Sequence, residues 1–203
     1  MKDCTKDWRL ISSIVLAHIL LYITFSDKDI FWYIYTAANL FFISFAIVSE
    51  QIDDKQKTSN YLLYGILSGL ALYGLFWIGD WLLSILPTNW DREVSRIYKL
   101  YSPEFFWHYI VLILVFIPGE EIFWRGFVQK RLSIYFNQWT ALIVSSLLYA
   151  SIFIYADKMI WMIAAFFAGI CWGLLYIWKK SIPMLIISHL VFDLLVIVLL
   201  PFR

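Results

Sequence analysis

The chain has 203 residues, of which 62% are hydrophobic and 20% aromatic, while only 15% are charged. A mean hydropathy of +0.75 is far above that of a water-soluble domain and predicts an integral membrane protein. The net charge of +1 provides no basic field for a nucleic acid partner. Cys4 and Cys171 lie far apart in the sequence, so they suggest neither a disulfide framework nor a metal cluster.

Apolar runs, taken in chain order, predict an all-α polytopic membrane bundle of about seven transmembrane helices joined by short polar loops. The runs are Trp8–Phe25, Ile30–Val48, Tyr61–Leu86, Phe105–Leu132, Thr140–Tyr155, Met159–Trp178 and Ile182–Leu200. The first run follows basic residues, as a signal peptide does, but no small-residue cleavage site follows it, so we expect it to remain as a span. The larger loops are expected at Ser49–Asn60 and Pro87–Glu104.

The domain organisation is expected to be one membrane domain, since the sequence shows neither a low-complexity linker nor an internal repeat. Residues 1–104 would supply three N-terminal spans and a loop, and residues 105–203 would supply four spans. With this order of spans, ten of the sixteen basic residues fall on the side of the N-terminus and six on the other side. The positive-inside rule therefore predicts a cytoplasmic N-terminus.

Polar side chains within the predicted spans are the candidates for function, because a charge at bilayer depth is costly unless it faces a protein interior or a wet cavity. These residues are His18, Asn39, Asp80, His108, Glu120, Glu121, Arg125, His189 and Asp193. Asp80 lies near a span end, where a solvated or capping role is expected.

The stretch "IPGEEIFWRG" holds the first constellation. Glu120 and Glu121 point about 100° apart on a helix, whereas Glu121 and Arg125 are four residues apart and can pair on one face. This pairing leaves Glu120 as the group able to take and return a proton. The alternative is a structural Glu–Arg pair with a spectator glutamate beside it.

The stretch "SHLVFD" holds the second constellation. His189 and Asp193 lie one helical turn apart, so they can act jointly, or Asp193 can simply satisfy an inert core histidine. Counted from the basic residues Lys130 and Lys180 at the helical rise, Glu120 lies about 15 Å and His189 about 14 Å into the membrane. We therefore expect the two constellations to meet at one depth.

These motifs, in this order, resemble those of the CPBP family of membrane endopeptidases, which includes type II CAAX prenyl proteases and bacteriocin-processing enzymes. The family pattern is EExxxR, then FxxxH, then HxxxN or HxxxD, on three helices of a membrane core. Glu120, Glu121 and Arg125 match the first motif, and His189 with Asp193 matches the third. The resemblance covers about half of the chain and identifies residues 105–203 as the CPBP-like catalytic core.

The second motif departs from the family pattern. The letters "YASIF" place Tyr149 at the aromatic position and Phe153 where the family has a histidine. His18 lies outside the matched region, and His108 lies about 18 Å before Glu120 along what should be the same helix. Neither is expected to replace the missing histidine.

The resemblance implies a role for each matched residue. Glu120 would be the base that activates a water, Glu121 and Arg125 would be the positioning pair, His189 would donate to the developing oxyanion, and Asp193 would orient His189. No cofactor or metal is expected, because no second histidine completes the usual zinc ligand set. The expected partners are membrane lipid and a peptide or membrane-protein substrate, in a multi-pass protein of a bacterial cell membrane.

Three interpretations of function stay open. The resemblance predicts a glutamate-dependent intramembrane endopeptidase, whereas the missing histidine favours a catalytically impaired family member that acts as a membrane binding, immunity or regulatory protein. A small transporter with Glu120 and Asp80 as proton carriers is the third, and the lack of an inverted repeat counts against it.

Overall fold

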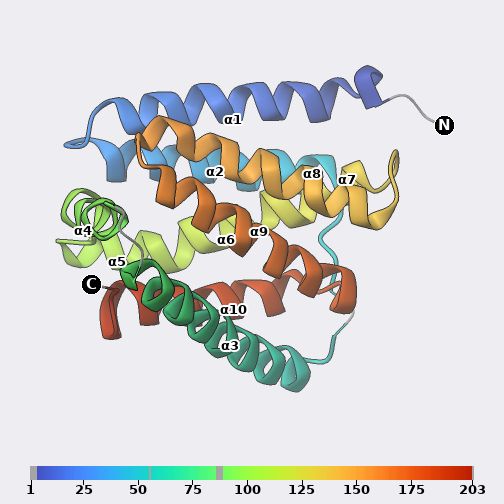
Figure 1. Ribbon diagram of the computed structural model, residues 1–203. Helices are drawn as coiled ribbons and strands as arrows, with labels where there is room; N and C mark the ends of the chain where they lie inside the picture. Colours follow the sequence, from blue (N-terminus) through green and yellow to red (C-terminus); the bar gives the residue numbers. More distant parts are fainter. Residues whose placement is uncertain (1–3, 55, 86–88, 203) are drawn as a thin grey trace.

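The computed structural model describes residues 4–54, 56–85 and 89–202 as a bundle of helices (Figure 1). Within these residues, seven helical segments are long and apolar enough to cross a membrane. They are Trp8–Ser26, Phe31–Ser49, Asn60–Ile85, Phe106–Leu132, Gln138–Ala156, Met159–Lys179 and Ile182–Leu199. The predicted all-α membrane bundle is confirmed, with ends within a few residues of those expected; the predicted end of the third run, Leu86, lies outside the described residues.

Six long helices carry most of the bundle: α1 (Trp8–Ser26), α2 (Phe31–Ser49), α3 (Thr58–Ile85), α8 (Gln138–Ser151), α9 (Met159–Lys179) and α10 (Ile182–Asp193). In Figure 1, α1 and α2 run along one side, α3 and α10 along the opposite side, and α8 and α9 between them. The two chain ends lie at opposite ends of the bundle, as an odd number of spans requires. A 3₁₀ turn, η4 (Ile152–Ala156), continues α8, and a π-helical segment, η5 (Leu194–Leu199), continues α10.

The fourth span changes its helical type along its length. Its segments are α5 (Phe106–Val111), the π-helical η2 (Leu112–Phe116), α6 (Ile117–Glu120), the π-helical η3 (Glu121–Gln129) and α7 (Lys130–Leu132). Pro118 lies between the two π segments and has no backbone N–H to donate to the preceding turn. Because π-helical turns re-aim side chains and are frequent at functional sites, the irregular backbone around Glu120 is the first structural pointer to the site.

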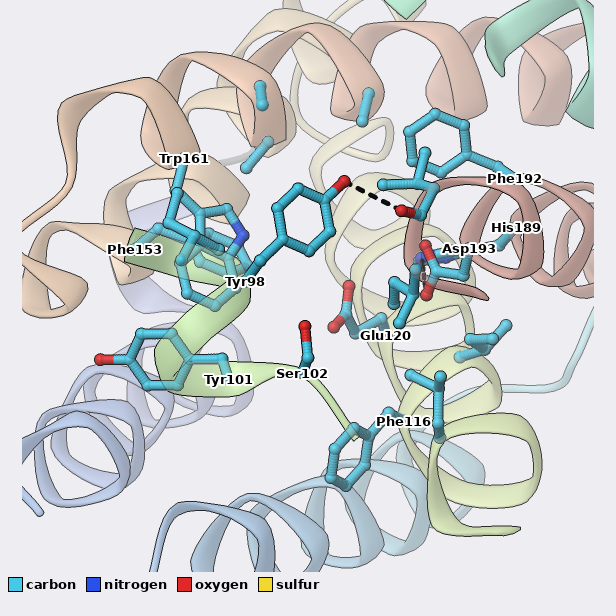
Figure 2. A pocket seen from close by; sticks show the side chains of 18 of the residues that line it. Tyr98, Tyr101, Ser102, Phe116, Glu120, Phe153, Trp161, His189, Phe192 and Asp193 are labelled. Atoms are coloured by element: carbon cyan, nitrogen blue, oxygen red, sulfur yellow. Dashed lines mark hydrogen bonds and ion pairs between the residues drawn. The ribbon is translucent and has the colours of Figure 1, made fainter. Parts of the chain in front are cut away.

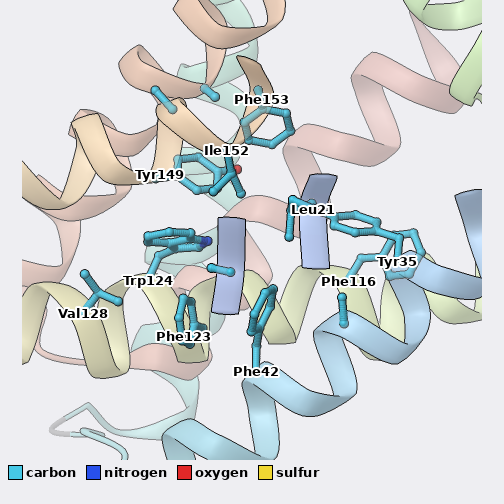
Figure 3. Close-up of a cluster of buried hydrophobic side chains, with 14 of the residues drawn as sticks. Leu21, Tyr35, Phe42, Phe116, Phe123, Trp124, Val128, Tyr149, Ile152 and Phe153 are labelled. Atoms are coloured by element: carbon cyan, nitrogen blue, oxygen red, sulfur yellow. The ribbon is translucent and has the colours of Figure 1, made fainter. Parts of the chain in front are cut away.

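Aromatic packing fixes this irregular span against its neighbours. Phe42 of α2 stacks on Phe123 with ring centroids 4.5 Å apart, and Trp124 meets Tyr149 of α8 at 5.5 Å (Figure 3). A Cβ at Gly119 would lie 2.6 Å from Asn39 Oδ1, so α2 can come this close only to a glycine. The fourth span is therefore held on both flanks over the stretch that carries the carboxylates.

One predicted loop is a helix. Residues 89–104, expected as part of a loop, contain α4 (Trp90–Tyr101), which lies across the direction of the spans and is seen nearly along its axis in Figure 1. Its apolar residues Val94, Ile97, Tyr98 and Tyr101 have the spacing of one helical face. Acidic residues in its first turn and Lys99 in its last turn complement the helix dipole. The loop prediction was wrong because the alternating charges lower the mean hydropathy and hide this spacing.

Ion pairs tie the spans together at the end of the bundle where the N-terminus lies. Arg131 donates to Asp7 at 2.6 Å and to Glu50 at 2.5 Å, which joins the starts and ends of three spans. Burial on its own would raise the pKa of Asp7, but hydrogen bonds from Arg131 and Tyr135 outweigh it and lower that pKa. We refer to Asp7, Glu50 and Arg131, together with the Asp53–Lys130 pair, as the rim cluster.

Candidate active site

The structure brings the first and third motifs together, as their predicted depths suggested. Glu121 Oε1 accepts a hydrogen bond from Arg125 Nη1 at 3.2 Å and lies 2.8 Å from His189 Nδ1. All three side chains are buried, with Glu121 entirely excluded from solvent. Because η3 and α10 arrive from different parts of the chain, this three-residue network links the two halves of the predicted site.

Aromatic rings hold the network in place. The guanidinium carbon of Arg125 lies 4.7 Å from the ring centre of Tyr149 and 5.3 Å from that of Trp172. Trp172 also stacks on His189 with ring centroids 3.8 Å apart, and its indole N–H donates to Ser188 Oγ at 3.3 Å. A cation between two π faces is stabilised electrostatically, so the two rings stabilise the buried Arg125 guanidinium.

Glu120 has hydrogen-bond partners that the sequence did not suggest. The hydroxyl of Tyr35, from α2, donates to Oε1, and the hydroxyl of Tyr149, from α8, donates to Oε2, both at 2.5 Å. No cationic group among the described residues pairs with this carboxylate, so the expectation that only Glu121 is neutralised by a cation agrees with the geometry. The expectation that Glu120 is left free is corrected, because each of its oxygens already accepts one hydrogen bond.

Asp193 approaches His189 from the other side of the ring. Its Oδ2 lies 3.6 Å from Nε2, which is too long for a hydrogen bond but close enough for an ion pair. The short contact of the ring is instead the one between Nδ1 and Glu121. Orientation of His189, which the resemblance assigned to Asp193, is therefore supplied first by Glu121.

A cavity of about 260 Å³ joins these groups (Figure 2). Glu120, His189 and Asp193 line it, whereas Glu121 and Arg125 lie behind them in the protein. Figure 2 shows Glu120 and Asp193 pointing into one space. Most of the remaining lining is apolar or aromatic and comes from α2, α4, α9 and the segments that follow α8 and α10. Within the described residues, no group of three histidine, cysteine or acidic side chains could hold a metal ion.

The helix that the sequence analysis missed closes one side of this cavity. Tyr98 of α4 donates its hydroxyl to the Val196 carbonyl at 2.9 Å and accepts from the Phe202 amide at 3.1 Å. Burial raises the pKa of Tyr98 to about 12, so its hydroxyl keeps the proton that it donates. Ser102, just after α4, also lines the cavity and points into it (Figure 2).

Phe153, the residue at the position of the missing histidine, forms part of the cavity wall. Its ring packs edge-on against Tyr149 at 5.5 Å and lies 5.2 Å from Trp161. A hydrophobic side chain thus occupies the place beside Tyr149 where the family pattern has a titratable one. The aromatic residue Tyr149, in contrast, brings a hydroxyl to Glu120.

The other polar residues of the predicted spans do not line the cavity. His108 Nδ1 accepts the Glu104 amide at 3.0 Å and so caps the start of α5. His18 bridges α1 to the end of α8 through the Tyr155 hydroxyl at 3.0 Å and Ser151 Oγ at 3.3 Å. The expectation that neither histidine stands in for the missing one agrees with these contacts. Asp80 is also absent from the lining of this cavity.

Fold and site together define a class: a polytopic membrane protein in which carboxylate, arginine and histidine side chains from separate helices meet beside a buried cavity. A protein-family model described as type II CAAX prenyl endopeptidase Rce1-like matches residues 102–195. The matched segment contains all five predicted site residues, and it supports the resemblance of this part of the chain to the CPBP family of membrane endopeptidases. Searches of curated proteins and of solved structures give no match.

Proposed function

We propose that the protein is a glutamate-dependent intramembrane endopeptidase that cleaves a membrane-associated peptide or protein by attack of water on the scissile amide. The observation that carries the proposal is the convergence of Glu120, His189 and Asp193 on one largely apolar cavity, where Glu121, itself paired with Arg125, holds His189 from behind. Buried charges of this kind are costly, and a packing scaffold gains little from them.

Glu120 is the proposed base. A carboxylate offers about four lone-pair positions, and the hydroxyls of Tyr35 and Tyr149 use one on each oxygen. The remaining positions can accept a hydrogen bond from a water in the cavity. As the water oxygen attacks the carbonyl carbon, its proton passes to Glu120, which then gives it to the leaving amine.

His189 is the proposed oxyanion donor. Its Nδ1–H is directed to Glu121, so a second proton on Nε2 leaves that nitrogen free to donate toward the cavity. A tetrahedral intermediate carries negative charge on the former carbonyl oxygen, and a fixed donor stabilises it. Asp193, 3.6 Å from Nε2, keeps this side of the ring turned to the substrate.

A second candidate function is a family member that has lost hydrolysis and uses the cavity for binding, as an immunity or regulatory protein. Two observations favour it: both oxygens of Glu120 already accept tyrosine hydroxyls, and Phe153 supplies no acid or base beside them. Loss of an acid–base partner typically costs about 10²–10⁴ in rate. This alternative predicts a partner protein rather than a cleaved substrate.

The test is a quantitative survey of protein N-termini in host membranes, comparing the native protein with Glu120→Gln at matched abundance. The matched control is Asp80→Asn, which removes a carboxylate from α3 outside the cavity. New N-termini that disappear with Glu120→Gln and persist with Asp80→Asn would support proteolysis and name the substrate. Identical profiles for all three proteins would contradict it and turn the search to binding partners.

We also propose that the N-terminus is cytoplasmic and that the protein resides in a bacterial cell membrane, as the distribution of basic residues and the resemblance indicate. The rim cluster, which contains Arg131 and Lys130, would then face the cytoplasm, and α4 would lie at the other surface.

A further inference from the structure

The buried groups behind the cavity balance one another in charge. Glu121 and Arg125 form one ion pair at 3.2 Å. His189 and Asp193 form a second contact, and a proton between them can reside on the ring or on the carboxylate without changing their combined charge. With that proton present the four residues are neutral, and without it they carry one negative charge.

The Glu120 carboxylate has no cationic partner among the described residues. Its oxygens accept hydrogen bonds from the two neutral hydroxyls of Tyr35 and Tyr149, each at 2.5 Å. Hydroxyl donors orient a carboxylate but do not cancel its charge. With Glu120 ionised, the cavity carries a net negative charge whichever way the His189–Asp193 proton lies.

Apart from His189, whose charge is balanced by Asp193, the described residues that line the cavity supply no positive group. Among the described residues that line it there is no lysine and no arginine, while aromatic rings from α2, α9 and the segments around them form much of its wall. Aromatic faces attract cations. The cavity volume of about 260 Å³ is near the lower end of the roughly 300–1,000 Å³ typical of ligand sites, so the space suits a short peptide segment better than a large ligand.

We propose that the cavity takes a hydrophobic peptide segment that places one ammonium or guanidinium group against Glu120. The rest of the segment would contact the apolar wall, and the cationic group would provide the charge that Glu120 lacks. A segment with an acidic side chain at this place would be rejected by the same carboxylate. This inference rests on the proposed function only in taking the cavity as the substrate site, because charge complementarity applies to binding with or without hydrolysis.

The test is a binding experiment with the full chain in discs of zwitterionic lipid. The probes are three dye-labelled hydrophobic peptides with blocked ends that differ only in a central Lys, Gln or Glu, so that the ammonium can come only from the side chain. A fourth peptide has Gln at the centre and a free N-terminal amine, which separates a terminal from a side-chain ammonium. Mass spectrometry of the same samples records cleavage.

We expect the Lys peptide to bind about tenfold more tightly than the Gln peptide, from charge attraction reduced by desolvation, and the Glu peptide to bind more weakly than both. Glu120→Gln should abolish the preference, and Asp80→Asn should retain it. Equal affinities for the three blocked peptides in the native protein would overturn the inference without any variant, as would a Lys preference that survives Glu120→Gln.

The outcomes for charge preference and for hydrolysis can be told apart. A Lys preference that depends on Glu120 but yields no cleaved peptide would support this inference and count against proteolysis. Cleavage of all peptides with equal affinity would support proteolysis and overturn the inference. If only the peptide with the free amine binds more tightly, the cavity prefers a terminal ammonium. This result would overturn the proposal of a side-chain cation.

Discussion

Two regions of the molecule use the same kind of interaction for different ends. In the rim cluster, Arg131 pairs with Asp7 and Glu50 where water can still reach the guanidinium, whose side chain is 20% exposed. In the site, Arg125 and Glu121 pair with 3% and 0% side-chain exposure. Within the described residues, Arg125 Nη2 and Glu121 Oε2 have no hydrogen-bond partner.

This difference in exposure means that burial of the two ion pairs has different costs in free energy. The Arg131 guanidinium at the rim keeps part of its hydration, although Asp7 is buried, and its ion pairs join three spans. A buried pair with unused donors and acceptors is expensive and is weak evidence for stability. The Arg125–Glu121 pair lies behind His189 and Glu120, and this position indicates a role in function. Real proteins leave buried polar groups unsatisfied mainly at functional sites.

The largest effect is expected from breaking the buried pair. Arg125→Met should lower stability by about 3–5 kcal/mol, because it leaves the buried Glu121 carboxylate without its arginine and with His189 as its remaining partner. Lys130→Met at the rim should cost about 1 kcal/mol or less, since its pair with Asp53 is partly exposed. Denaturant unfolding in detergent measures both. Equal losses of stability in the two variants would mean that the Arg125–Glu121 pair only joins helices, as the rim pairs do.

A smaller effect is expected from adding an acid–base group to the site. Phe153→His should raise peptide cleavage about tenfold or more, because general acid–base catalysis contributes about 10²–10⁴ in rate and the new ring would lie beside Tyr149. The rate with the substrate found in the N-terminal survey is the measurement, and Phe166→His, on a partly buried α9 residue outside the cavity lining, is the control. No gain, with the fold intact, would contradict the proposed water-activating site.

The smallest effect is expected from pH at the rim. Hydrogen bonds lower the pKa of Asp7, and those from Tyr176 and Lys130 likewise outweigh burial and lower the pKa of Asp53. A carboxylate with a lowered folded-state pKa contributes stability above its ordinary value of 3.8, and that contribution is lost as the pH falls through the lowered pKa.

Melting temperatures measured between pH 7 and pH 3 should therefore fall below about pH 4. The fall should be shallower in Asp7→Asn, which cannot titrate at this position. A curve of the same steepness in this variant would show that the rim does not set the acid limit.

Much of the fold could be predicted from the sequence, because a span needs a continuous apolar run and the charges between runs mark its ends. The Glu121–Arg125 pair followed from helical spacing, and the meeting of Glu120 and His189 at one depth followed from counting residues along two helices. These inferences need only the local geometry of a helix.

The remaining parts depend on contacts between distant segments. Tyr35 lies 85 residues before Glu120, and nothing near it in the sequence indicates that its hydroxyl reaches that carboxylate. The preference of His189 for Glu121 over Asp193 depends on how α10 rotates against η3, which the i, i+4 spacing could not reveal. The helix α4 did leave a signal in its apolar spacing, but an average over a window of mixed charge conceals it.

Gly119 has a consequence for how this protein can change over time. Any other residue there would bring its Cβ to 2.6 Å from Asn39 Oδ1, and Asn39 is fully buried with its amide bound to the Tyr35 carbonyl at 3.0 Å. Position 119 is therefore closed to single-step variation while Asn39 stays in place. We therefore expect the two positions to change together, and because Tyr35 lies one helical turn before Asn39, a change in this pair would displace a partner of Glu120.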